Sequence, residues 1–248
     1  MSNDASPDSD RNKAGSFPDT LWSVVAVAGR AGSGQSDAAL NRLCEQYWYP
    51  LYCYIRRRGY SPDDAQDLVQ GFFERLLRKE FFAEADRTKG KLRGFMLSSL
   101  QYFMLDERKK MSAAKRGGGV TFVQIDAEEA DSRYLAEPEN ADSPDVVFER
   151  QWANTVMQRA TDTLADAWRK EGKIDVFEAL SPFLLSTMEG AAARQIASRF
   201  QMTEGHVKVS LHRLRERYSS VLRKEIAETV NSEAEIDSEL AALRAAIQ

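Results

Sequence analysis

The stretch from Glu189 to Glu225 constrains the fold most, because it combines two helical patterns with a tight turn between them. The first helix would bury an apolar face made of Ile196, Ala197 and Phe200. Residues 201–202 fill the turn, and Thr203 can cap the second helix because its hydroxyl accepts a free backbone N–H group. Apolar residues then recur every three or four positions, at Val207, Leu211, Leu214, Tyr218, Val221 and Leu222. This spacing predicts a second helix with one face turned to a core.

The remaining faces of this second helix are strongly basic. They carry His206, Lys208, His212, Arg213, Arg215, Arg217, Arg223 and Lys224. A short helix followed by a basic helix is the arrangement of helix-turn-helix proteins, in which the second helix enters the major groove of DNA. A basic amphipathic helix can also be only a solvated surface or half of a coiled coil. The capped turn and the alanine-rich helix before it favour nucleic-acid binding.

Charge along the chain is segregated. The chain has 248 residues and a formal net charge of −4, so it has no overall attraction to nucleic acid. Positive charge is concentrated in segments 56–58, 108–116 and 208–224, whereas acidic residues gather in segments 126–149 and 225–239. Because phosphate contacts need clustered Lys and Arg, any binding to DNA must depend on the basic segments.

The two cysteines, Cys44 and Cys53, are nine residues apart in one predicted helix. That separation is about 13 Å along the helix axis, too far for a disulfide, so both are expected to be buried and reduced. With two scattered histidines, the sequence predicts no zinc or other metal site and no cofactor. It shows neither a signal peptide nor a membrane-spanning run, so we expect a cytoplasmic protein that does not engage a membrane.

Strand patterns are almost absent, which predicts an all-α fold. Ser61 and Ser143 each precede a proline and an acid, which is a typical start of a helix. We expect helices over residues 62–78, 92–111 and 144–172. The expected organisation is a disordered N-terminus (1–18), a first helical domain (19–116), an acidic linker (117–144), a helix-turn-helix domain (145–230) and an acidic C-terminal helix (231–248).

The order of these segments resembles that of the sigma factors of bacterial RNA polymerase, in particular the extracytoplasmic-function class. Residues 38–78 look like the family's first conserved region, with Asp67-Leu68-Val69-Gln70 and the two phenylalanines at 72–73 as the core signature. Residues 90–110 look like the segment that holds the minus-10 promoter element, and residues 189–217 like the helix-turn-helix that reads the minus-35 element. The resemblance implies two helical domains, core RNA polymerase and promoter DNA as partners, and no catalytic residues.

The resemblance also implies a polymerase-binding surface, formed by Asp64, Asp67, Gln70 and Phe73. Asp67 and Gln70 are three residues apart and share a helix face, where a carboxylate and an amide beside aromatic groups suit an arginine-bearing helix. The two acids would also favour the N-terminus of a helix without any partner, an interpretation that explains the charges but not Gln70.

For the minus-10 element, the resemblance implies that residues 86–93 form a loop around a flipped base. The adjacent DNA-contacting residues would be Tyr102, Arg108, Lys109 and Lys110. Flipped bases stack on aromatic groups, and basic residues follow the single strand. The chain departs from the family pattern at Ser98 and Tyr102, which leaves the base preference open. For the minus-35 element, the implied contacts are Thr203, His206, Lys208, Val209, His212, Arg213 and Arg215.

Other functions were weighed against this one. A stand-alone helix-turn-helix regulator would bind DNA without polymerase, and an adaptor that has lost promoter recognition would not keep the basic helix. The segment 29–36 nearly spells a phosphate-binding loop, but Gln35 stands where lysine is needed and no alternation of strands and helices follows. No nucleophile–base or paired-carboxylate pattern indicates an enzyme. The sequence leaves open whether an anti-sigma factor or other regulator binds, and where the C-terminal tail docks.

Overall fold

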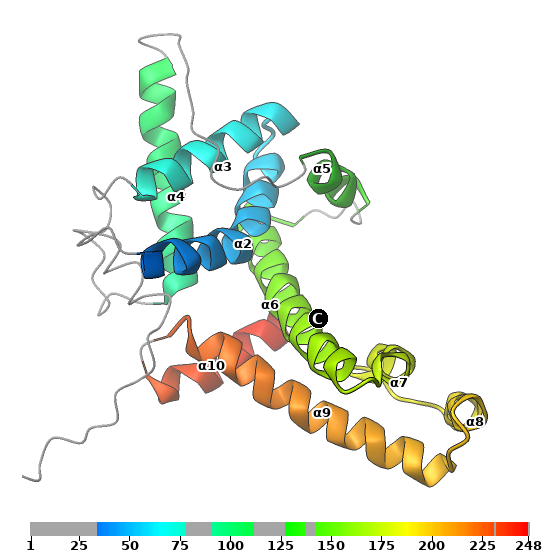
Figure 1. Ribbon diagram of the computed structural model, residues 1–248. Coiled ribbons are helices and arrows are strands. Elements are labelled where there is room, and N and C mark those ends of the chain that lie inside the picture. The colour runs from blue at the N-terminus through cyan, green and yellow to red at the C-terminus, as the bar shows by residue number, and fades with distance from the viewer. Residues whose placement is uncertain (1–33, 78–90, 112–126, 137–141, 231, 248) are drawn as a thin grey trace, which may run out of the picture.

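The computed structural model describes residues 34–77, 91–111, 127–136, 142–230 and 232–247, and it is all-helical over these ranges, as predicted (Figure 1). Its elements are α2 (Gly34–Arg57), α3 (Pro62–Leu77), α4 (Leu92–Met111), α5 (Ala127–Leu135), α6 (Pro144–Lys170), α7 (Ile174–Leu180), the 3-10 turn η2 (Ser181–Phe183), α8 (Gly190–Arg199), α9 (Glu204–Ala227) and α10 (Glu233–Ala246). The expected disordered segment 1–18 lies outside the described residues. No helix of the described ranges is long and apolar enough to cross a membrane.

Helices α2 and α6 form the central packing unit, and no other helix pair within the described ranges has a more extensive contact. The aromatic run in α2 explains its position, because Tyr47, Trp48, Tyr49, Tyr52 and Tyr54 are all buried. A helix that is apolar on all sides must be covered on all sides. Helices α3 and α4 pack against α2, whereas α9 and α10 pack against α6 (Figure 1).

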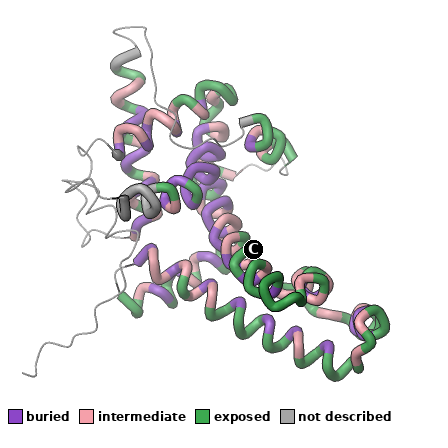
Figure 2. Tube along the Cα trace, in the orientation of Figure 1, coloured by how far each residue is buried: buried purple, intermediate pink, exposed green. Residues whose placement is uncertain are grey.

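One continuous hydrophobic cluster runs through both of the domains that the sequence suggested. Buried residues follow α2 and continue into the first half of α6, as Figure 2 shows. Because α2 belongs to the expected domain 19–116 and α6 to the expected domain 145–230, the structure does not confirm two separately packed domains.

The helix boundaries follow from local capping. Ser61 Oγ accepts a hydrogen bond from Asp64 N at 3.1 Å, and Ser143 Oγ accepts one from Val146 N at 3.3 Å, so both predicted caps are confirmed. At the other end of α6, Gly172 has a φ of 68° and Lys173 N donates to Trp168 O at 2.9 Å. This is the glycine-terminated helix end that the sequence placed near residue 172.

Helix α5 lies within the segment expected to be a linker, and the sequence analysis did not predict it. It docks on α2: Asp131 accepts hydrogen bonds from Tyr52 Oη at 3.0 Å and from Arg56 Nε at 3.1 Å. Arg133 lies over the ring of Tyr49, 4.0 Å from its centroid, and Ala130 is buried. At least this part of the acidic segment is therefore a packed helix rather than a solvated tether.

The predicted C-terminal helix is present as α10, which contacts both α6 and α9. Its buried side chains are Ile236, Glu239 and Leu243, so one of the carboxylates of this acidic helix lies in the interior. The tail thus docks on the body of the protein itself, which the sequence left open.

Candidate nucleic-acid interface

The connection between α8 and α9 is a tight turn with a defined hydrogen-bond pattern. Gln201 N donates to Ser198 O at 3.4 Å and Met202 N donates to Ala197 O at 2.9 Å, which is the Schellman pattern of helix ends. Gln201 occupies the left-handed position with a φ of 53°, where glycine is the usual residue. Thr203 Oγ1 then accepts from His206 N at 3.1 Å and starts α9, so the predicted cap is confirmed.

Helix α9 separates an apolar face from a polar one. The buried side is Val207, Leu211, Leu214, Tyr218, Leu222 and Ile226. The exposed side carries most of the residues expected to contact DNA: His206, Lys208, Val209, His212 and Arg213. His212 Nε2 lies 3.4 Å from Glu216 Oε1 on the same surface. This side presents cationic groups and one exposed valine, a mixture that suits phosphates, base edges and a thymine methyl group.

Arg215 has a structural contact that the sequence did not predict. Its guanidinium donates to Phe183 O at 2.8 and 3.2 Å, and to Ser186 O at 2.7 Å. These carbonyls lie in and just after η2, where a backbone that leaves helical geometry has free acceptors. Arg215 therefore ties the segment before α8 to α9, and its expected contact with DNA stays a prediction.

A second exposed surface lies on α4. Tyr102 is 69% exposed and Leu105 is 52% exposed, and both lie opposite the buried Met96, Leu100 and Phe103. Arg108 and Lys109 extend this surface toward the end of the helix. The side chain of Lys110 and the loop residues 86–90 lie outside the described residues. An exposed aromatic ring next to cations is an arrangement that can stack on a nucleic-acid base.

Arg93, expected at the edge of the minus-10 loop, does not face an open pocket. Its side chain is 14% exposed and pairs with Glu239 of α10 and with Glu149 of α6. Both partners already occupy its guanidinium in this structure, and the loop expected over residues 86–93 stays a prediction.

The four expected polymerase-binding residues on α3 differ in their exposure and hydrogen bonds. Asp67 is exposed and Gln70 is half-buried, with Gln70 Nε2 donating to Glu74 Oε1 at 3.3 Å. Asp64 is exposed but accepts from Ser61 Oγ at 2.7 Å, so it takes part in the cap.

Phe73 is 4% exposed and meets Phe72 edge to face at 5.5 Å, so its ring packs in the core in this structure, and its expected part in a polymerase-binding surface stays a prediction. It lies four residues after the buried Val69, which places it on the core face of the helix.

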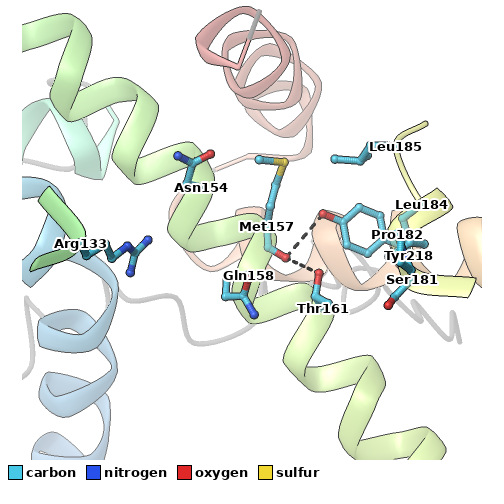
Figure 3. Close-up of a pocket in the computed structure, with 10 residues that line it drawn as sticks. All are labelled: Arg133, Asn154, Met157, Gln158, Thr161, Ser181, Pro182, Leu184, Leu185 and Tyr218. Carbon is cyan, nitrogen blue, oxygen red and sulfur yellow. Dashed lines mark hydrogen bonds between the residues drawn. The ribbon is translucent and has the colours of Figure 1, made fainter. Parts of the chain in front are cut away.

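A groove of about 530 Å³ lies between α6, η2 and α9, with Arg133 of α5 at one side (Figure 3). Met157 O accepts from Thr161 Oγ1 at 2.9 Å and from Tyr218 Oη at 3.5 Å, and burial raises the pKa of Tyr218. None of the lining residues is Asp, Glu, His or Cys. The described ranges contain no group of three or more such residues that could hold a metal ion.

In comparisons with known proteins, no family model, curated protein or solved structure matches the chain. The function must therefore be argued from the two exposed surfaces of α4 and α9 and from α3. Sequence reasoning missed one cluster completely, the pairing of Lys91 and Arg93 with Glu239. The available signal was a carboxylate at the helical spacing of Ile236 and Leu243.

Proposed function

We propose that this protein is a sigma factor of the extracytoplasmic-function type, which binds core RNA polymerase and directs it to promoters. The observation that carries the proposal is the exposed side of α9, on which Lys208, His212 and Arg213 follow a Thr203-capped turn and lie opposite a buried apolar stripe. This geometry suits a recognition helix in the major groove.

The surface of α4 supports the second half of the proposal. Tyr102 is the residue best exposed for stacking on an unpaired base, and Arg108 and Lys109 lie where they can follow the strand's phosphates. Asp67 and Gln70 on α3 remain candidates for contact with polymerase. Because both partners belong to the bacterial cytoplasm, we place the protein there.

A stand-alone DNA-binding regulator is the second candidate. Burial of Phe73 favours it, because the proposed polymerase surface loses its aromatic member. The two candidates share the α9 surface and differ in the need for polymerase, so an experiment that measures both partners separates them.

The test combines co-purification with core polymerase and promoter footprinting. Arg213→Ala is expected to weaken the footprint and leave polymerase binding intact, with Arg244→Ala on the exposed side of α10 as the matched control. Asp67→Ala combined with Gln70→Ala is expected to do the reverse, with Asp63→Ala as its control. Loss of both partners in either variant would contradict the division of roles. A footprint by the chain alone, without polymerase, would favour the stand-alone regulator.

A further inference from the structure

Glu239 is a buried carboxylate at the centre of the C-terminal helix. Its side chain is 1% exposed, and it pairs with two cations from the start of α4. Arg93 Nε lies 2.8 Å from Glu239 Oε2, Arg93 Nη2 lies 3.4 Å from Oε1, and Lys91 Nζ pairs with Oε1. Both oxygens are therefore occupied by groups that lie 146 or more positions earlier in the chain.

The same arginine reaches a third helix. Arg93 also pairs with Glu149 of α6, and its guanidinium lies 4.8 Å from the ring centroid of Trp152. Two cations and two carboxylates thus join α4, α6 and α10 in a charge-balanced cluster. Tyr47 of α2 lies beside it, and its pKa is raised first by burial and then by the negative charge of Glu239.

This cluster differs from the ion pair that Asp237 of α10 forms. Asp237 pairs with Arg223 of α9 at 2.6 Å, but the two side chains are 73% and 40% exposed, so solvent screens that pair. A buried carboxylate has no such screening, and removing its partners leaves a charge that the interior cannot solvate. A 14-residue helix is also marginal by itself in water, so α10 depends on its docking contacts to remain folded.

We propose that α10 is an intramolecular latch: with Glu239 seated between Lys91 and Arg93, it ties the start of α4 to the α6–α9 side of the protein, in addition to the direct contacts of α4 with α2, α3 and α6, and its undocking loosens the start of α4. The consequence for activity rests on the proposed function, because α4 and α9 carry the two DNA-contacting surfaces. Docked α10 adds a restraint between these surfaces to the one that the packing of α2, α6 and α9 already provides, and undocking removes that added restraint in the fraction of molecules that open. The latch itself is a property of the free protein.

The direct test is amide hydrogen exchange on the free, full-length chain. Glu239→Gln is expected to speed exchange in α10 and at the first hydrogen-bonded amides of α4, from Phe95 onward, by more than about tenfold while the α2–α6 core stays protected. Asp237→Asn is the matched control, and it is expected to leave exchange in α4 unchanged. Unchanged exchange in Glu239→Gln, or an equal increase in every helix, would overturn the latch.

A second variant covers the case in which Glu239→Gln does not fold. Lys91→Gln removes only the cation whose side chain is 31% exposed. It is expected to raise the exchange rates of the same amides in α10 and α4, but by a smaller factor. Absence of that increase would overturn the latch.

In the functional arm, Glu239→Gln is expected to raise the fraction of promoter–polymerase complex, and an unchanged or lower fraction would overturn the regulatory role. If the unmodified chain binds no polymerase, the proposed function fails while the exchange result stands.

Discussion

Two arginines on α9, two residues apart, allow a sharp test of the difference between folding and DNA contact. Arg215 donates three hydrogen bonds to the carbonyls of Phe183 and Ser186, whereas Arg213 lies on the exposed side of the helix. Charge-assisted bonds contribute more than neutral ones, but these carbonyls can be rehydrated when the guanidinium is removed. We therefore expect Arg215→Ala to lower the free energy of unfolding by about 1–2 kcal/mol, and Arg213→Ala to leave it within about 0.5 kcal/mol.

Urea denaturation measures the free energy of unfolding, and the salt dependence of promoter binding measures contact with DNA phosphates. A lysine or arginine that contacts a phosphate releases a counterion, so Arg213→Ala should reduce the slope of log K against log salt by about 1. Arg215→Ala should leave that slope unchanged at temperatures where it is folded. The reasoning is refuted if Arg215→Ala is as stable as the unmodified chain, or if it reduces the slope as Arg213→Ala does.

Three further perturbations follow from the structure. Gln201→Gly should raise the free energy of unfolding by about 0.5–1 kcal/mol in urea, because glycine adopts the left-handed backbone without strain, and a loss of stability would contradict this. Burial raises the pKa of the Cys44 thiol to about 12, so an alkylating reagent should modify it only after unfolding, and rapid modification of the native chain would oppose this. Burial also raises the pKa of Glu228 more than Arg42 lowers it, so the folded state holds this proton more tightly than the unfolded state. The stabilising contribution of Glu228 is present at low pH and lost as pH rises through the folded pKa. In thermal unfolding, the Tm of Glu228→Gln relative to that of the unmodified chain should therefore be higher at pH about 7 than at pH about 4. The opposite trend would exclude burial as the dominant cause.

The features that the sequence predicted correctly depend on neighbouring residues. The caps at Ser61, Ser143 and Thr203 each form between residues three apart, and the buried stripe of α9 follows from its spacing. Such local patterns are readable because the partners lie within one turn of helix.

The features that it missed depend on partners far away in the chain. Helix α5 is polar, and Asp131 meets Tyr52 and Arg56 from more than seventy positions away. Glu239 meets Arg93 across 146 positions, and nothing in either local sequence specifies the other. The joint packing of α2 and α6 likewise cannot be inferred from the change in composition that suggested two domains.

Phe73 shows a different limit. Its assignment came from a resemblance, whereas its spacing from Val69 placed it on the core face. The spacing of Phe73 from Val69 agrees with its burial, a point that the resemblance did not take into account.

We propose that this chain gives core RNA polymerase a promoter preference, and transcription with purified components is the decisive test. Core polymerase, the chain and a library of promoter fragments are combined, and transcript start sites are mapped. We expect discrete start sites that appear only when the chain is added and that are lost with Asp67→Ala combined with Gln70→Ala. The proposal is contradicted if the chain neither associates with core polymerase nor produces any start site beyond those of core polymerase alone.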